Sequence, residues 1–293
     1  MSLPIPALLL TLGAAIAWSA FDAARKILAN EIRPVPLAAA LSWLQTPIFL
    51  IWLFVEGSWS INSEYAVSGV AVFGANITAS VLFFEALRRS SLSLTVPLLS
   101  LSPVITALLG NWLLDEQLTP SQWSGVGLVV LGAMTLNTRG TDFWRPDQMI
   151  LGIFRESGSL IMIAVAACWA TTTVFDKIAL QHVSIPMHVS IQTLALASAL
   201  TIWLLWKRQA SDILRARTMP RAFYGGVVVS CLALTLQLHA IQLLPVGIME
   251  AIKRTCGIFF AIGIGRAFFG EELTSGKITA GVLMSIGVVL LST

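Results

Sequence analysis

Apolar residues fill ten stretches of the chain, which are separated by short segments rich in polar residues, Gly or Pro. A helix that crosses a bilayer needs roughly 20 mostly apolar residues, and most of the stretches come close to that length. The pattern predicts ten transmembrane helices, at residues 5–24, 35–55, 66–87, 92–114, 121–136, 160–180, 186–206, 223–243, 246–269 and 278–291. Because many connections are short, neighbouring helices should run antiparallel.

The longest polar stretch divides these helices into two groups of five. It runs from Asn137 to Ser157 and contains six charged residues, which is typical of a solvated connection. We therefore divide the chain into a first five-helix repeat at residues 1–137, a connecting loop at residues 138–157 and a second five-helix repeat at residues 158–293.

The two halves also match each other in sequence, as in an internal duplication. The best match sets LLDEQLT at residues 113–119 against FFGEELT at residues 268–274. Each half also has a Lys eight residues after a Trp near the end of its first helix. Since five is an odd number, the second copy must enter the membrane from the opposite side. The expected fold is an all-α integral membrane protein with ten transmembrane helices in two inverted five-helix repeats.

Composition supports the membrane class and excludes several others. The chain is 56% hydrophobic and 11% charged, with a mean hydropathy of +0.83, whereas soluble domains carry roughly 25% charged residues. No metal or nucleophile motif accompanies Cys168, Cys231 and Cys256. We therefore expect no enzyme activity, no metal and no cofactor. The net charge of +3 is small and dispersed, which gives no support to nucleic-acid binding.

The stretch LSLSPVITALLG at residues 99–110 is followed by DEQLT at residues 115–119, and FFGEELT closes the ninth predicted helix. In these stretches the chain resembles the EamA family of the drug/metabolite transporter superfamily. The resemblance implies a multi-pass secondary transporter of the inner (plasma) membrane, often an exporter of amino acids or other metabolites, with a cavity between its halves. It implies no particular substrate.

Together these features predict a transporter that moves a small polar metabolite, such as an amino acid, by alternating access of its two halves. Export is the expected direction, and coupling to protons is left open. The alternative is a flippase for a lipid-linked intermediate, which would need a lateral opening between helices. The expected partners are a small-molecule substrate and the lipid bilayer, and the sequence is compatible with both a monomer and a dimer.

The distribution of Lys and Arg bears on orientation. Nearly all of the 18 basic residues follow predicted helices one, three, five, seven and nine, and five lie at residues 207–221. The positive-inside rule then places these connections in the cytoplasm and both termini outside. The family resemblance implies cytoplasmic termini instead, and we follow the charge distribution.

Charges inside the ninth predicted helix are the first candidates for substrate binding. Each ionisable group at membrane depth costs about 2.5–3.5 kcal/mol on insertion scales and normally faces a cavity or a partner. Glu250 and Arg254 have the spacing of an intrahelical pair, and Lys253 adds a second positive charge. The excess positive charge would meet Asp22, Glu85 or a substrate carboxylate. The alternatives are an ion-pair lock between helices and side chains that extend to the membrane interface.

A second group of candidates repeats in both halves. Trp18 and Asp22 share one helix face, and Trp169 repeats the position in the second half. Lys26 and Lys177 follow at equivalent positions. These residues would build a pseudo-symmetric site, with an aromatic ring against the substrate. Alternatively, the Trp side chains fill the core and the Lys residues mark helix ends.

Glu85 and His239 lie at equivalent places near the ends of the third and eighth predicted helices. Either group could bind and release a proton as the cavity alternates, and a packing role is equally compatible with His239. His188 lies nearer a connection and carries less weight. The polar residues Gln192 and Gln237 are expected to form interhelical hydrogen bonds or to contact substrate.

Overall fold

The computed structural model describes residues 4–28, 31–89, 96–135, 157–218, 220–269 and 274–291. The predicted connecting loop at residues 138–157 lies outside this part except for Ser157, which begins a helix. The described chain is helical, and the β-type pairing within it is an isolated bridge between Ile61 and Val183.

Helices appear where the hydrophobic pattern predicts them. The first half contains α1 (Ile5–Leu28), α2 (Pro34–Glu56), α3 (Tyr65–Arg89), the 3-10 helix η1 (Val96–Leu101), α5 (Ser102–Leu114) and α6 (Pro120–Thr135). The second half contains α8 (Ser157–Ala179), α9 (Ile185–Trp206), the 3-10 helix η3 (Ala210–Thr218), α10 (Pro220–Leu243), α11 (Val246–Phe269) and α12 (Ser275–Leu291).

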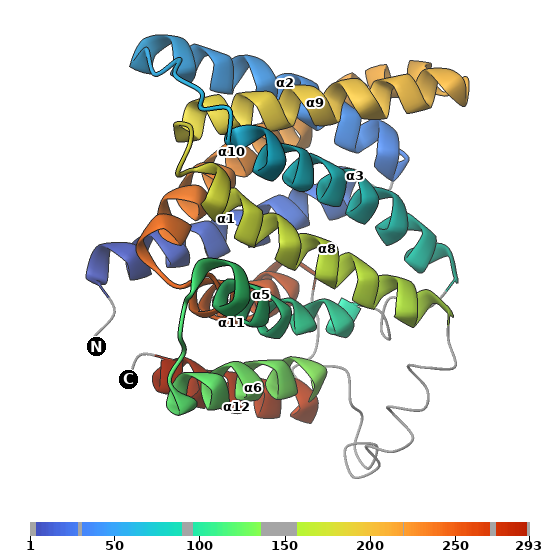
Figure 1. Cartoon of the computed structure of the whole chain (residues 1–293). Helices are drawn as coiled ribbons and strands as arrows, with labels where there is room; N and C mark the ends of the chain where they lie inside the picture. The colour runs from blue at the N-terminus through green and yellow to red at the C-terminus, as the bar shows by residue number, and fades with distance from the viewer. Residues whose placement is uncertain are drawn as a thin grey trace.

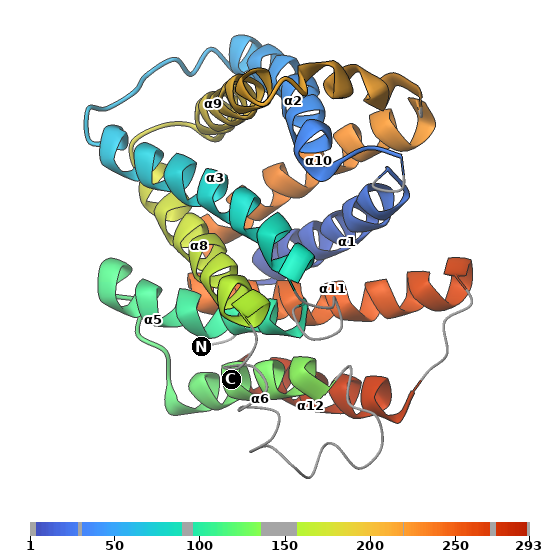
Figure 2. The same ribbon diagram turned by 90° about the vertical axis from the view of Figure 1, so that its right-hand side faces the viewer.

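Every main helix packs along a helix of the other half. The pairs are α1 with α10, α2 with α9, α3 with α8, α5 with α11 and α6 with α12. Figure 1 shows α2 and α9 at one edge of the molecule and α6 and α12 at the opposite edge, with the remaining pairs between them. The same order is visible after rotation in Figure 2, where the start of α1 and the end of α12 again lie near each other. The two halves are thus interleaved.

The fourth predicted helix is broken. Its first turns form η1, and the α-helical part begins only at Ser102, with Pro103 in its first turn. Proline lacks a backbone N–H and is tolerated in the first turn of a helix but not in its interior, which explains a new start at this point. The break matters for function because it places Ser102 at a helix terminus inside the bundle.

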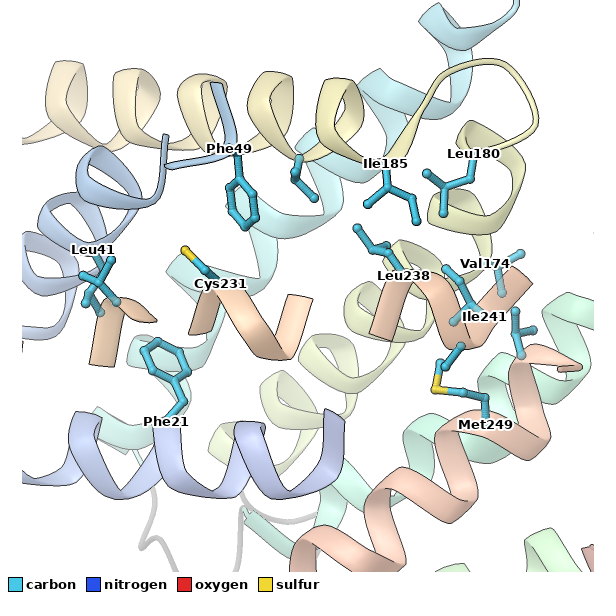
Figure 3. Close-up of a cluster of buried hydrophobic side chains, with 14 of the residues drawn as sticks. Phe21, Leu41, Phe49, Val174, Leu180, Ile185, Cys231, Leu238, Ile241 and Met249 are labelled. Atoms are coloured by element: carbon cyan, nitrogen blue, oxygen red, sulfur yellow. The ribbon is translucent and has the colours of Figure 1, made fainter. Parts of the chain in front are cut away.

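The largest core cluster surrounds α10. Figure 3 shows Phe21 of α1 and Phe49 of α2 on opposite sides of this helix, with Leu238 and Ile241 of α10 buried further along. All four side chains have at most 7% exposure. Burial of such apolar side chains holds α10 against α1 and α2 of the first half.

Glycines let α6 and α12 approach closely. A Cβ atom added at Gly125 would lie 2.7 Å from the carbonyl oxygen of Gly287, and one added at Gly287 would lie 2.8 Å from the carbonyl oxygen of Gly125. Small residues at such contacts are typical of helix packing in membranes, where close van der Waals contact replaces the hydrophobic effect.

In the part of the chain that the structure describes, six helices are long and apolar enough to cross a membrane, namely α1, α2, α3, α8, α9 and α10, and two shorter apolar helices end at Leu114 and Leu291. Large apolar side chains such as Phe54, Val67 and Ile202 are exposed on their outer faces, as expected for contact with lipid. The expectation of an all-helical membrane protein is confirmed. The helix α11 has 24 residues, but it carries three charges near its start.

Candidate functional site

Three charged residues near the start of α11, Glu250, Lys253 and Arg254, form a compact cluster. Glu250 has only 5% of its side chain exposed, and its Oε2 atom forms an ion pair with the Lys253 ammonium. The other carboxylate oxygen of Glu250 lies 3.6 Å from the Arg254 guanidinium. The i,i+4 spacing predicted from sequence therefore brings Glu250 and Arg254 together, and the cluster retains one positive charge in excess.

Two other helices complete the cluster with neutral polar groups. Ser102, at the start of α5, donates a hydrogen bond to Glu250 at 3.2 Å and accepts one from Arg254 at 3.1 Å. Gln237 of α10 accepts hydrogen bonds through Oε1 from Lys253, at 2.9 Å, and from the indole nitrogen of Trp18, at 2.8 Å. The cluster thus joins α1, α5, α10 and α11 near the middle of the bundle.

One donor of this cluster has no partner. The Nε atom of Arg254 is buried and makes no hydrogen bond within the described part of the chain, although the guanidinium as a whole retains 26% exposure. An unsatisfied buried donor is costly, and a guanidinium offers a fork of donors that matches carboxylate and phosphate groups. The arrangement is suited to receiving an anionic group.

Both predicted partners of the excess charge pair with a cation of their own helix. Asp22 pairs with Arg25 at 3.4 Å, and its side chain is exposed. Glu85 pairs with Arg89, one turn further along α3, at 2.7 Å. Asp22 also interacts electrostatically with Arg254, so it lies near the α11 cluster as the sequence predicted. Lys26 lies on α1, and its side chain falls outside the described part.

The two predicted tryptophans have different surroundings. Trp18 bonds to Gln237 and so belongs to the α11 cluster. Trp169 packs instead against Phe83 of α3, with ring centroids 5.6 Å apart. The helix positions are equivalent in sequence, but the structure does not bring the two indoles into one site.

His239, the second candidate for proton binding, lies apart from the charged groups. Its Nδ1 atom bonds to the carbonyl oxygen of Thr235 at 2.8 Å, and its ring stacks on Trp52 at 6.2 Å. A carbonyl only accepts, so Nδ1 carries a hydrogen. The half-buried Trp52 thus packs inside the bundle and differs in this from the strongly exposed Trp112 and Trp206.

Lys177 forms an ion pair with Glu116 that links the two halves, the tie between them. Its ammonium bonds to Glu116 Oε1 at 2.6 Å and to the carbonyl oxygen of Leu244 at 2.7 Å. The second oxygen of Glu116 accepts a hydrogen bond of 2.7 Å from the backbone N–H of Val246, the first residue of α11. A carboxylate at a helix N-terminus also interacts favourably with the helix dipole. The DEQLT segment therefore connects α5, α8 and α11 at one end of the bundle.

A buried polar chain that sequence reasoning missed joins α3, α8 and α9. Asp176 and His188 lie 2.9 Å apart, and the other ring nitrogen of His188 lies 3.1 Å from the hydroxyl of Tyr65. Gln192 donates to the same hydroxyl at 3.2 Å and to the carbonyl oxygen of Gly69 at 2.9 Å. The sequence favours His188 less than His239 as a proton-binding residue, because His188 lies close to a connection between helices.

Comparison with a family model gives a match over most of the chain. The EamA-like transporter family matches residues 5–138 and 156–293. A solved crystal structure shares the fold, with a TM-score of 0.74 over 97% of this chain and 95% of the other, at 15% sequence identity.

Two curated proteins are similar to about a third of the chain. Both are described as probable 4-amino-4-deoxy-L-arabinose-phosphoundecaprenol flippase subunit ArnE. The protein from Serratia proteamaculans is 29% identical over 99 residues, which are 34% of this chain and 76% of its own length. The protein from Aeromonas hydrophila is 27% identical over 99 residues, which are 33% of this chain and 77% of its own length.

Proposed function

Because the chain belongs to the EamA-like transporter family, we propose that it carries a small polar substrate with an anionic group across the membrane. The family consists of transporters, so the expectation of a multi-pass membrane transporter rather than an enzyme is confirmed. The finer proposal concerns the substrate and its binding site. An amino acid or a related carboxylate is the leading substrate class, with Arg254 and Lys253 binding the carboxylate.

The observation that carries this proposal is the unpartnered Nε atom of Arg254 within a cluster of net charge +1. A carboxylate that docks on this guanidinium would satisfy the donor and neutralise the excess charge. Trp18 lies next to the cluster through Gln237 and offers an aromatic surface to the rest of the substrate. Asp22, four residues after Trp18 and exposed, is the candidate partner for a substrate ammonium group.

Alternating access by two inverted five-helix repeats is the proposed mechanism, and the helix pairing supports it. Exchange of the two halves converts the pair of α1 and α10 into the pair of α8 and α3. The same exchange converts each of the pairs α2 with α9, α5 with α11 and α6 with α12 into itself. Such an arrangement allows one packing to be replaced by its counterpart on the opposite side of the membrane, related to it by a pseudo-two-fold axis.

The tie between Glu116 and Lys177 is the proposed closure on one side. It connects a segment of the first half to two helices of the second half, and both side chains are largely buried, at 12% and 19% exposure. Opening of this end requires the ion pair and the bond to Val246 to separate. The described structure therefore corresponds, in this proposal, to a state closed at the end where α11 begins.

A flippase for a lipid-linked intermediate is the second candidate, favoured by the printed names of the two curated relatives. Their substrate combines an amino sugar with a phosphate, and the phosphate would suit the same guanidinium. An apolar groove between α11 and α12, lined in part by Phe259, Ile278, Gly281 and Ile286, would accommodate an acyl or prenyl chain beside the bundle.

A transport assay in proteoliposomes separates the two candidates. Uptake and efflux of radiolabelled amino acids are measured with and without a pH gradient. In parallel, vesicles that contain a fluorescent undecaprenyl-phosphate amino sugar are tested for exposure of the probe on the outer leaflet. We expect saturable flux of at least one amino acid, and stimulation of flux by the gradient if protons are coupled.

Flux of amino acids without lipid-probe movement supports the metabolite transporter. Movement of the lipid probe without amino-acid flux transfers the proposal to the flippase. Absence of both activities in correctly inserted protein would overturn the assignment of the anion site to either substrate class.

A further inference from the structure

The buried chain formed by Asp176, His188, Tyr65 and Gln192 has no part in the proposed substrate site. Only 9% of the Asp176 side chain and 2% of the His188 side chain are exposed. Their helices, α8 and α9, are both apolar membrane spans. Asp176 lies in the last turn of α8 and His188 in the first turn of α9. A carboxylate and an imidazole are costly to bury even near the ends of such helices, and groups of this kind recur in proton pathways of transporters.

The hydrogen bonds allow more than one placement of hydrogens along this chain. The carbonyl oxygen of Gly69 only accepts, so the amide nitrogen of Gln192 faces it, and the same nitrogen donates to Tyr65. A hydroxyl has one hydrogen and two acceptor sites, so Tyr65 can either donate to Nδ1 of His188 or accept a hydrogen from it. The contact between His188 and Asp176 can therefore take up or release one proton while each of these hydrogen bonds is kept.

Among the described side chains, no cation forms an ion pair with Asp176 besides His188 itself. Lys177 follows Asp176 in sequence, but its ammonium binds Glu116 and the carbonyl oxygen of Leu244. On the neighbouring α2–α3 connection, Glu64 pairs with His182 at 3.3 Å. Other described charged and titratable groups of the packed helices have partners elsewhere: Glu85 with Arg89 on α3, His239 of α10 with Thr235, and Glu250, Lys253 and Arg254 of α11 with one another.

Addition of one proton changes the net charge of the pair by one unit, whichever of the two groups carries it. In a buried, coupled pair the proton belongs to both groups together. The residual exposure lies mainly on Asp176, so the carboxylate is the entry point for the proton. A change of net charge at a buried pair is a substantial free-energy change and can bias a conformational equilibrium.

We propose that the Asp176–His188 pair is the proton-binding site that couples transport to a pH gradient. This inference rests on the proposed transport function and names its coupling ion and residues. The pair is next to the tie between the halves, because Asp176 and Lys177 are consecutive on α8. A movement of α8 that separates Lys177 from Glu116 also moves Asp176 relative to α3 and α9. Binding of a proton and opening of this end are thereby linked.

Two transport modes distinguish proton coupling from a structural role. Exchange of ¹⁴C-labelled amino acids at equal pH on both sides needs no net proton movement, whereas accumulation under a pH gradient does. A one-unit gradient can drive about tenfold accumulation when one proton moves per substrate, because one pH unit corresponds to a factor of ten. The variants are Asp176→Asn and His188→Gln. The matched control is His182→Gln, which alters an imidazole–carboxylate pair at the surface.

We expect Asp176→Asn to retain exchange and to lose accumulation, and we expect His182→Gln to retain both. Retention of both activities in Asp176→Asn and His188→Gln would overturn the inference. Loss of both activities in a variant with unchanged thermal unfolding would also overturn it, because the pair would then serve structure or substrate binding. Wild-type protein that exchanges amino acids but does not accumulate them under a pH gradient would refute proton coupling and leave the transport proposal intact.

A measurement without substrate keeps the test independent of the transport proposal. The chain has three histidines, so ¹⁵N-histidine labelling gives a simple spectrum in which His188→Gln assigns the His188 signals. We expect these signals to change as the pH is lowered and the pair binds a proton. The pH response should differ in Asp176→Asn and be unchanged in His182→Gln. A pH-independent His188 signal would overturn the inference even if no amino acid is transported.

Discussion

The helices α1 and α8 occupy equivalent places in the two halves, yet their polar residues do different things. On α1, Trp18 bonds to the charged cluster of α11 through Gln237, and Asp22 is exposed. On α8, Trp169 packs against an aromatic ring, and Asp176 is sealed against His188. Asp176 is seven residues after Trp169 and so corresponds to Arg25 of α1, not to Asp22. The two equivalent helices therefore contribute to the proposed substrate site in one half and to a closed polar chain in the other. The repeat in the sequence predicts where the helices lie, whereas the contacts of each polar side chain depend on the neighbouring helices.

The largest expected effect concerns the buried carboxylate of the α11 cluster, which Trp18 of α1 contacts through Gln237. Glu250→Gln leaves Lys253 and Arg254 without their buried counter-charge, and such removal of one partner costs about 3–5 kcal/mol. The free energy of unfolding, measured by denaturant titration in mixed micelles, should fall accordingly. Asp22→Asn is the control, because an exposed pair contributes only about 0–1 kcal/mol. Equal losses in the two variants would contradict the buried charge balance.

An intermediate effect is expected at the tie between Glu116 and Lys177, near the end of α8. Glu116→Gln weakens the bonds to Lys177 and to the Val246 N–H, and hydrogen bonds to charged groups contribute about 1.5–3 kcal/mol. Hydrogen exchange of the peptide that contains Val246 should become faster, as this end opens more often. Glu64→Gln, the same change at an exposed carboxylate on the α2–α3 connection, should leave the exchange unchanged. Unaltered exchange in Glu116→Gln would argue against a closure at this position.

The smallest expected effect is the difference in stability between variants of the two tryptophans. Trp18→Phe removes the hydrogen bond to Gln237, which contributes about 1 kcal/mol. Trp169→Phe keeps an aromatic ring against Phe83 and removes no described hydrogen bond, so its cost should be smaller. The difference between the two variants in thermal unfolding temperature is the readout. A larger loss in Trp169→Phe would reverse the roles assigned to the two helices.

The helices could be predicted because apolar length is a local property of the chain. The break before Ser102 is also a local effect, because Pro97 and Pro103 cannot lie in the interior of a regular helix. The intrahelical pairing of Glu250 with Arg254 followed from spacing alone, since residues four apart share a helix face. These features depend on a few neighbouring residues.

Contacts between helices could not be predicted in the same way. Nothing in the sequence near Gln237 indicates that it accepts from both Trp18 and Lys253. His188 seemed less informative than His239 because it lies four residues from a connection, but the bundle closes over it and exposes only 2% of its side chain. Glu116 was part of the recognised motif, whereas its bond to the first N–H of α11 depends on the packing of three helices.

The α11 cluster is proposed to bind the anionic group of the substrate. Uptake of ¹⁴C-labelled amino acids into proteoliposomes should be measured for Arg254→Ala and Lys253→Ala, with Lys207→Ala as the control. Lys207 is an exposed cation at the end of α9, and its ammonium lies 4.5 Å from the centroid of the Trp206 ring. Loss of a charge-assisted contact predicts a fall in uptake of about tenfold or more in both α11 variants, in folded and inserted protein. Uptake by Lys207→Ala should stay near the wild-type rate. Full activity in both Arg254→Ala and Lys253→Ala would contradict binding of the anionic group at this cluster.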